Sequence, residues 1–405
     1  MRTKFPAILF FLFLFGMGVL EACLPDTDIS AAERRRLAKA PALSADTLLS
    51  GSYMTDMETY LLDQFPGRNL FRCMKANFDL KLLQKEDTDG YYLIENSIYK
   101  RPAPVKENNI LLCADYFDRI MRTYFPDIQG HYIVIPEKSY YAALSSKNPT
   151  LDDRDILSKQ EKALSLLETS ALVSIDLYSQ LSVSDFYHTD SHWRQECLPD
   201  AAEYILAGLS KEREGHTRES ASFYREVLLS DTFYGGLSAA SGLKPAPDRL
   251  ITLTNEKMES AVVYDYESKK SLSVYQPEKL SSPDPYDIYL GGAKALLEIR
   301  VPHPQNGREL VLFRDSFGSS IAPLLLEEYD VIYLVDLRYI TVSNAMRYIS
   351  PAPDCDVLFL YSTATLSGGG IRLENISIST PPESHANPDP SIQSELSSPL
   401  SPKAR

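Results

Sequence analysis

The stretch from Glu309 to Ser362 constrains the fold most, because three apolar runs in it are separated by two segments of helical spacing. The apolar runs, rich in β-branched and aromatic residues, are ELVLFR, VIYLVDLRYI and CDVLFLYS, and the helical segments between them are SSIAPLLLEEY and SNAMRYIS. Strands that alternate with helices in this way pair in parallel and are covered by helices on both faces. The stretch therefore predicts a three-layer α/β/α fold with a mainly parallel central sheet.

The earlier part of the chain continues this alternation. The expected elements are a helix over residues 52–65, a strand at HYIVIPEK, a helix over 155–170 and a strand at ALVSIDLY. In the first of these helices, Thr55 and Glu58 have the spacing of a capping box. The sheet is thus expected to continue upstream of the C-terminal strands.

Composition narrows the class of protein. A chain of 405 residues with 44% hydrophobic residues can bury one large core or two modest ones. Its formal net charge of -14 argues against nucleic acid or another polyanion as a partner, because neutralising phosphates requires a basic surface. The five cysteines are far apart and form no CxxC pair, which excludes a zinc ribbon or a redox motif. They are expected to be mostly buried thiols, although two disulfides stay open for an exported chain.

The N-terminus carries the strongest indication of compartment. Two basic residues precede an apolar run from Phe5 to Leu20, so residues 1–22 are either a signal peptide or a membrane anchor. Cys23 follows as in a bacterial lipoprotein signal, although Glu21 is unusual there, so lipidation of Cys23 stays open. Against export, Arg34 to Arg36 form a basic flank that loop-charge bias favours keeping inside. We nevertheless expect an extracytoplasmic protein of the bacterial cell envelope, membrane-anchored or secreted.

The remaining chain divides by composition into three parts. Residues 23–45 are charged and irregular and are expected to be a mobile, non-catalytic linker. Residues 46–378 hold the alternating pattern and are expected to form the main domain. Residues 379–405 are rich in Pro and Ser and are expected to be a disordered tail.

A candidate nucleophile follows the first C-terminal strand. In a parallel sheet, reactive groups lie in loops at the carboxyl ends of strands. The loop after ELVLFR is RDSFGSS, which leads through a glycine into a helix. Ser316 in this loop is placed like the nucleophile of α/β esterases, exposed and close to a helix N-terminus. The alternative is that Ser316 or Ser319 only caps the helix, a common use of serine.

The stretch DFYHTDSHW, Asp185 to Trp193, supplies candidates for a base and its partner. Serine chemistry needs an imidazole to take the hydroxyl proton and an acid to orient the ring, and Asp190 and His192 lie two residues apart. On a strand, however, His188, Asp190 and His192 would share one face, where two imidazoles and a carboxylate bind zinc. The residues by themselves leave the triad and the metal site open.

The stretch YHTDSHW and the later Asp-Ser-Phe together resemble the signature of the bacterial DHHW protein family. That family is similar to SGNH-type acyl-ester hydrolases and to the alginate O-acetyltransferases of cell-surface polysaccharide assembly. The resemblance covers roughly residues 30–365, and further matching segments in order are SAAERRRLAKAP, DQFPGR, HYIVIPEK, DTFYGGLSAAS, YDIYLGGAKALLEI and YDVIYLVDLRYI. It implies an SGNH or flavodoxin-like α/β/α fold in which the acid and base precede the serine.

Carried over by position, the resemblance assigns roles to three residues. It implies that Ser316 is the nucleophile, that His192 is the general base and acid, and that Asp190 orients His192. The second position of the signature is occupied by Ser191, which is outside this triad.

The resemblance also identifies a departure at the expected oxyanion hole. Ala293 stands in YLGGAKA where an Asn donor is expected, and losing one such donor typically lowers turnover by about 10²–10³-fold. The expected substitutes are the backbone N–H groups of Ser316, Gly292 and Gly236.

These expectations combine into one leading hypothesis. The chain is expected to be a cofactor-independent serine esterase or O-acyltransferase that acts on an acylated glycan of the cell envelope or an extracellular polysaccharide. Expected partners are that glycan, the membrane through the N-terminus and a membrane protein that delivers acyl groups. The alternatives are a catalytically silent scaffold of the same fold and a metal-dependent hydrolase that uses His188, Asp190 and His192.

Overall fold

A single central sheet organises the molecule. The computed structural model describes residues 5–145, 162, 164–210 and 224–374. Within them, eight strands form one sheet in the order β10-β9-β11-β13-β12-β14-β5-β6. Their bounds are β5 Gly130–Ile135, β6 Leu172–Ser174, β9 Val262–Asp265, β10 Lys270–Leu272, β11 Leu296–Arg300, β12 Glu309–Arg314, β13 Val331–Val335 and β14 Asp356–Ser362. Strands β13, β12, β14, β5 and β6 run parallel, and β11, β9 and β10 extend one edge in antiparallel pairs.

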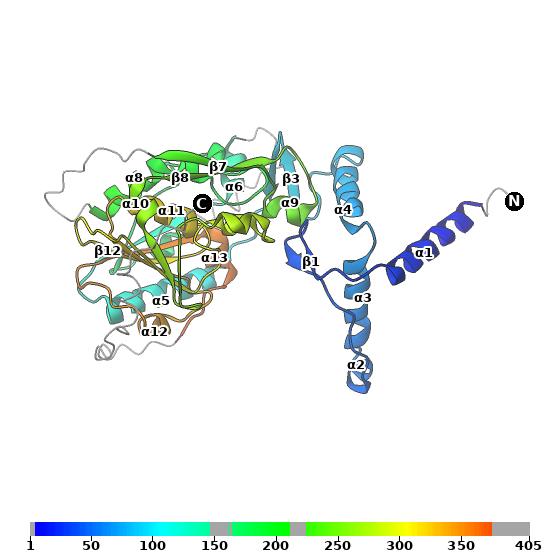
Figure 1. Cartoon of the computed structure of the whole chain (residues 1–405), viewed down its shortest axis with the longest axis horizontal. Helices are drawn as coiled ribbons and strands as arrows, with labels where there is room; N and C mark the ends of the chain where they lie inside the picture. Colours follow the sequence, from blue (N-terminus) through cyan, green and yellow to red (C-terminus); the bar gives the residue numbers. More distant parts are fainter. Residues whose placement is uncertain (1–4, 146–161, 163, 211–223, 375–405) are drawn as a thin grey trace, which may run out of the picture.

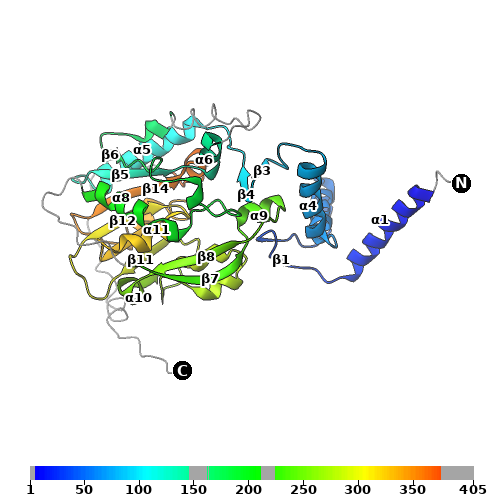
Figure 2. The same ribbon diagram turned by 90° about the horizontal axis from the view of Figure 1, so that it is seen from above.

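Helices cover both faces of this sheet (Figures 1 and 2). Side chains alternate along β12, so Leu310 and Leu312 face one side while Val311 and Phe313 face the other. The helices on the side of Leu310 are α6 Lys138–Ser145, α8 Pro199–Ser210, α10 Glu256–Ser260 and α11 Gly318–Leu325. Those on the side of Val311 are α5 Glu107–Tyr124, α12 Val342–Ala345 and α13 Thr363–Gly368. The predicted three-layer α/β/α fold is confirmed.

The predicted elements differ from the observed ones mainly at helix ends. The strand predicted at ELVLFR is β12. The strand predicted at HYIVIPEK overlaps β5, which begins one residue earlier, and the strand predicted at ALVSIDLY contains β6. The predicted capping box is wrong, because α3 begins at Ser52 after Gly51, whose φ of 78° turns the chain out of the preceding helix. Thr55 therefore lies inside α3. The helix predicted over 155–170 falls largely outside the described residues, as does the predicted disordered tail.

Two two-stranded ribbons and an arm of helices complete the fold. The ribbons are β3 Tyr91–Ile94 with β4 Ser97–Lys100 and β7 Arg225–Phe233 with β8 Asp248–Thr254, and α9 Gly236–Ser241 follows β7. The arm consists of β1 Ile29–Ser30, β2 Arg35–Arg36, α2 Ala45–Leu49, α3 Ser52–Gln64, α4 Arg68–Asn77 and a π-helical turn, η1 Phe78–Leu82. Figure 1 shows α3 and α4 between the α/β body and the N-terminal helix α1, Phe5–Cys23.

Among the described helices, only α1 is long and apolar enough to cross a membrane, and its side chains are exposed. All five cysteines are free thiols, of which Cys113 and Cys355 are buried. Cys23 is exposed at the end of α1. The signal peptide, the membrane anchor and lipidation of Cys23 all stay predictions.

Candidate active site

The serine loop lies at the carboxyl end of β12, between the ends of two neighbouring parallel strands. Asp315 fixes this loop, because its carboxylate accepts hydrogen bonds from Phe317 N at 3.1 Å and from Ser362 N and Oγ at 2.8 and 2.7 Å. Ser362 ends β14, so the loop is tied to the adjacent strand. The N-cap of α11 is Phe317 and no side chain caps the helix, so Ser316 is not a capping residue. The hydroxyl of Ser319 instead accepts a hydrogen bond from the buried Arg314 at 3.0 Å.

The histidine stretch is a hairpin loop rather than a strand. Phe186 and Trp193 pair in an antiparallel bridge, and Tyr187 N donates to His192 O at 3.1 Å. Trp193 Nε1 donates to Ser320 Oγ on α11 at 2.8 Å. The loop is thereby fastened to the helix that follows the serine.

These two loops bring the three predicted catalytic side chains into one hydrogen-bonded chain. Ser316 Oγ lies 2.8 Å from His192 Nε2, and His192 Nδ1 lies 2.7 Å from Asp190 Oδ1. With Nδ1 protonated, the ring donates to Asp190 and accepts the serine hydroxyl. The imidazole stacks on Tyr286 with ring centroids 4.0 Å apart and also contacts Phe317. The ring is therefore held in one orientation.

The electrostatics of the pair keep a proton on the imidazole side. Burial disfavours the imidazolium, but the charge and hydrogen bond of Asp190 outweigh it and raise the pKa of His192. Burial likewise opposes the carboxylate, yet His192, Arg34 and the N–H of Gly236 together lower the pKa of Asp190 below its usual range. Asp190 is therefore an anion at neutral pH.

Arg34 is a contact of this pair that the sequence does not predict. It lies within residues 23–45, which were expected to be a non-catalytic linker. Its Nη1 lies 3.4 Å from Asp190 Oδ2 and 2.9 Å from Asp284 Oδ1, and its Nη2 donates to Tyr234 O at 2.6 Å. Only 9% of the Arg34 side chain is exposed. The segment that follows α1 thus supplies a cation to the buried end of the triad.

The structure corrects the predicted oxyanion donors. The N–H of Gly236 donates to Asp190 Oδ2 at 2.5 Å, and that of Gly292 donates to Tyr289 O at 3.1 Å, so neither is free for a substrate. Ala293 is exposed and, with Gly292, is not among the residues that line the cavity at Ser316. Of the predicted donors, only the N–H of Ser316 has no acceptor within the described part of the chain. Position 293 therefore contributes no donor to this cavity in this chain.

A cavity of about 540 Å³ opens at Ser316 and His192. Tyr91 and Tyr99 of the β3–β4 ribbon and the segments 136–139 and 362–364 are among the parts that line it. This volume is large enough to hold a sugar-sized group beside the serine.

Lys138 lies in this cavity without being available as a base. Its Nζ donates to the carbonyl oxygens of Ile98, Tyr187 and His188 at 2.9, 2.6 and 2.9 Å, which uses all three ammonium protons. The side chain joins β4 to the beginning of the histidine loop, so we assign it a structural role.

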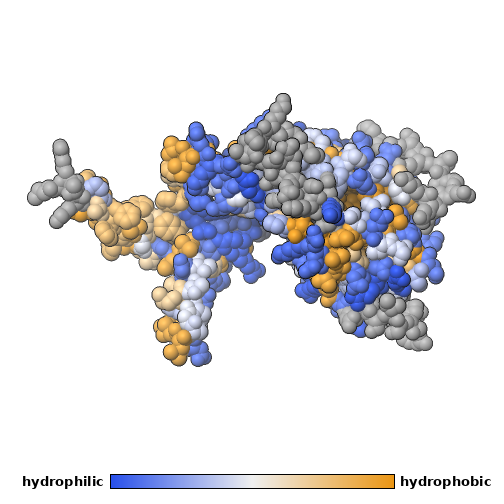
Figure 3. Space-filling model, turned by 180° about the vertical axis from the view of Figure 1, so that it is seen from behind, coloured by the Kyte–Doolittle hydropathy of each residue, from blue (hydrophilic) through white to orange (hydrophobic). Residues whose placement is uncertain are grey.

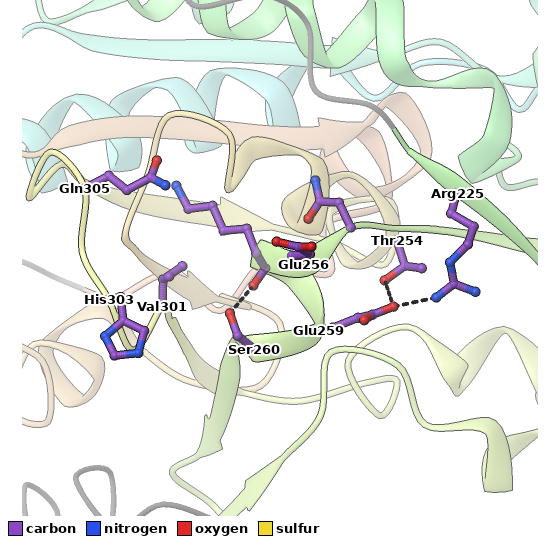
Figure 4. A pocket seen from close by; sticks show the side chains of 10 residues that line it. Arg225, Thr254, Glu256, Glu259, Ser260, Val301, His303 and Gln305 are labelled. Atoms are coloured by element: carbon purple, nitrogen blue, oxygen red, sulfur yellow. Dashed lines mark hydrogen bonds and ion pairs between the residues drawn. The ribbon is translucent and has the colours of Figure 1, made fainter.

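A larger open hollow of about 780 Å³ lies elsewhere, beside α10 (Figure 4). Its carboxylate Glu259 accepts hydrogen bonds from Arg225 at 2.6 Å and from Thr254 at 3.4 Å. A histidine and a serine, His303 and Ser260, both line this hollow, but they are not hydrogen-bonded to each other. The hydroxyl of Ser260 instead donates to Lys257 O. Among the residues that line this hollow, no nucleophile is hydrogen-bonded to a base. The cavity at Ser316 is therefore the better candidate for the active site.

The metal alternative fails on the shape of the loop. Its premise was a strand, on which His188, Asp190 and His192 would share a face, but the hairpin directs His188 to the surface, where its Nδ1 lies 3.4 Å from Asn96 Nδ2. Asp190 and His192 bind each other. In the part of the chain that the structure describes, no three His, Cys, Asp or Glu side chains gather as a metal site.

Comparisons with known proteins agree with this fold. No family model matches the chain, and no curated protein matches it in sequence. PatB1 from Bacillus cereus, whose structure with a sulfonyl adduct is known, has a TM-score of 0.55 and 17% identity, covering 70% of this chain and 98% of its own. A DHHW family protein from Eubacterium siraeum has a TM-score of 0.53 and 18% identity, covering 72% of this chain and 97% of its own.

The O-acetyltransferase domain of AlgJ from Pseudomonas putida has a TM-score of 0.39 and 14% identity, covering 76% of this chain and 98% of its own, a similarity too low to define a common fold. The resemblance that the sequence predicts is thus confirmed at the level of architecture, because this chain shares its fold with a DHHW family protein and with PatB1.

Proposed function

We propose that the protein is a serine-dependent acyl-transfer enzyme that removes an O-acyl group, such as acetyl, or moves it to a glycan hydroxyl. The observation that carries this proposal is the hydrogen-bonded chain of Ser316, His192 and Asp190 at the wall of a cavity. A silent scaffold has no need for a buried carboxylate aligned behind the imidazole, so the geometry favours the enzyme.

The reaction follows from the positions of the three side chains. Ser316 Oγ attacks the acyl carbon while His192 Nε2 takes its proton, and Asp190 stabilises the imidazolium. The N–H of Ser316 donates to the oxyanion. As the tetrahedral intermediate collapses, the ester bond breaks and His192 returns the proton to the leaving oxygen. Water or a sugar hydroxyl, deprotonated by His192, then attacks the acyl-serine. The bond between the acyl carbon and Ser316 Oγ breaks, and His192 returns the proton to Ser316 Oγ.

The substrate class and location belong to the same proposal. Tyr91 and Tyr99 line the cavity, and aromatic faces suit sugar rings. The exposed apolar helix α1 supports a position at a membrane. The proposed side is the outer one of a bacterial membrane, where an acylated glycan and a membrane protein that donates acyl groups would be the partners. Water as acceptor would make the protein an esterase, and a sugar hydroxyl would make it a transferase.

Covalent trapping tests the nucleophile directly. A sulfonyl fluoride, which needs an activated hydroxyl, is expected to form one Oγ–S bond at Ser316, with loss of fluoride and transfer of the serine proton to His192. Peptide mass spectrometry is expected to find the adduct on Ser316 in the wild type and in Ser191→Ala, and to find none in His192→Ala. An adduct on another serine, or equal labelling of His192→Ala, would contradict the proposal.

The pH dependence tests the role of Arg34. The base must be neutral, so kcat/KM for an acyl ester is expected to rise with pH through the pKa of His192, which lies above its ordinary value of 6.5. In Arg34→Ala the charge of Asp190 acts on the ring without an opposing cation, so the imidazolium becomes more stable. The acid limb of the profile is then expected to move to higher pH.

Arg34→Lys is the matched control, because it keeps the cation while losing the planar contacts with Tyr234 and Asp284. Its acid limb is expected to stay closer to that of the wild type. An unchanged limb in Arg34→Ala, or one that moves to lower pH, would show that Arg34 does not act on His192 through Asp190.

A further inference from the structure

An exposed apolar stripe runs along the helix formed by α4 and η1. Leu70, Met74, Phe78 and Leu82 follow one another at intervals of four residues and therefore lie along one side of the helix. They are 62%, 56%, 50% and 67% exposed. Side chains of this size in an amphipathic helix are normally buried against a core, and none of these four is. We call these residues the α4 stripe.

The opposite side of the same helix is packed against the body. Ala76 and Leu80 contact a small cluster with Ile98 of β4 and Leu237 of α9. Arg72 donates to the carbonyl oxygens of Ala239 and Ala240 at 2.9 and 2.8 Å, at the end of α9. The helix is therefore fixed to the body while its stripe faces outward.

The polar side of this helix is basic, in contrast to the rest of the chain. Residues 68–85 contain one acidic side chain, Asp79, and five basic ones, which are Arg68, Arg72, Lys75, Lys81 and Lys85. Arg68 and Arg72 pair with Glu33, and Lys75 and Lys85 pair with Asp79 while remaining about half exposed. Lys81 is exposed and has no ion pair within the described residues. The formal charge of this segment is thus +4, whereas the whole chain carries -14. An apolar stripe flanked by Lys and Arg is the composition of helices that lie in the interface of an anionic bilayer.

The arm is also tied to the end of α1. Gln64 at the end of α3 exchanges two hydrogen bonds with the backbone of Thr27, at 3.0 and 3.1 Å, and Tyr60 donates to Asp26 Oδ1 at 2.9 Å. Asp26 is three residues beyond the end of α1. Three residues of extended chain span about 10 Å, so this contact lies close to the end of α1. Figure 3 shows hydrophobic surface over α1 and again on the helical arm beside it. A membrane that holds α1 would therefore lie close to the arm.

From these observations we propose that the α4 stripe lies in the interface of an anionic lipid bilayer, beside the segment that α1 places in the membrane. The exposed lysines Lys75, Lys81 and Lys85 contact lipid headgroups, and the four apolar side chains enter the upper acyl region. Because α4 contacts α9, and the first residue of α9, Gly236, binds Asp190, this second contact sets the orientation of the Ser316 cavity toward the bilayer.

Tryptophan fluorescence in nanodiscs tests this proposal. The chain has one tryptophan, Trp193, which is fully buried, so an added tryptophan reports its own surroundings. The full-length variant Phe78→Trp is placed in nanodiscs of phosphatidylcholine and phosphatidylglycerol, with and without bromine on the upper acyl chain. The brominated lipid is expected to reduce the emission of the added tryptophan to about half, because interfacial helices bury their apolar face to this depth.

Tyr348→Trp is the matched control, since Tyr348 is 59% exposed and follows α12 on the body. Its emission is expected to be the same in both lipids. Leu82→Trp, a second position in the α4 stripe, is expected to behave like Phe78→Trp and serves if that variant misfolds. Two results would overturn the proposal: equal emission in both lipids at both stripe positions, or a blue shift that depends on protein concentration without lipid, which would make the α4 stripe an interface between copies.

Discussion

Replacing Ser316 by Ala is expected to lower the rate of p-nitrophenyl acetate hydrolysis by roughly 10³–10⁴-fold or more, with the same loss for His192→Ala. The reason is that Ser316 Oγ and His192 Nε2, 2.8 Å apart, act as one unit, so that either partner without the other has no route for the proton. The double variant is expected to be no slower than the slower single variant. Release of p-nitrophenol by the purified chain measures all three rates.

Ser191→Ala is the control for this comparison. Ser191 is exposed at the rim of the same cavity, and its hydroxyl makes no hydrogen bond within the described residues. Its rate is expected to stay within a few-fold of the wild type. Circular dichroism checks that each variant is folded. Equal rates for wild type and Ser316→Ala would contradict the proposed function. Additive losses in the double variant would mean that the two side chains act separately.

Replacing Gly235 by Ala is expected to reduce activity about as much as removing the carboxylate of Asp190. The backbone of Gly235, with φ of -86°, suits any residue, so conformation is no obstacle. The obstacle is space, because an added Cβ would lie 2.2 Å from the Cβ of Asp190 and 2.6 Å from its Cα. Asp190 would have to move and would release His192, so we expect a loss of roughly 10³-fold or more, as when the acid of a serine triad is lost.

Gly236→Ala is a matched control one residue away. A Cβ there would lie 3.5 Å from Asp190 Oδ2, an ordinary contact, and the N–H that donates to Asp190 would remain. Its kcat/KM is expected to stay within about tenfold of the wild type, while Gly235→Ala resembles Asp190→Asn. Measuring kcat/KM and thermal midpoints of the three variants separates loss of geometry from loss of folding. Similar activity in the two glycine variants would show that the close approach of Gly235 is unimportant.

The parts of the fold that local pattern controls were predictable. The apolar runs around Phe313 and Phe359 specify buried parallel strands by themselves, and the loop that carries Ser316 follows from the end of such a strand. The pairing of Asp190 with His192 was also predictable, because the two residues are only two positions apart in the chain. Ends of helices were less predictable, as the start of α3 at Ser52 shows, since capping depends on the neighbouring backbone.

Long-range contacts were not predictable from one sequence. Arg34 meets Asp190 across 156 residues, and nothing in a basic, irregular segment identifies which arginine will be buried. The N–H of Gly236 was expected to bind substrate, yet it serves Asp190 across 46 residues. In both cases the partner is a donor to Asp190 Oδ2, the oxygen of the buried carboxylate that does not face His192. Which donor reaches that oxygen depends on the packed structure.

The contacts at Ser320 join the two segments of chain that carry the catalytic side chains. Trp193 Nε1 and Tyr286 OH meet its hydroxyl at 2.8 Å, and Gln195 Nε2 donates to its carbonyl oxygen at 2.7 Å. His192 and Ser316 are 124 positions apart in the chain, and these buried bonds hold the loops that carry them next to each other. Asp190 and His192 lie in the described segment 164–210 and Ser316 lies in the segment 224–374, so neither segment carries the whole triad and the bonds at Ser320 hold its two parts together.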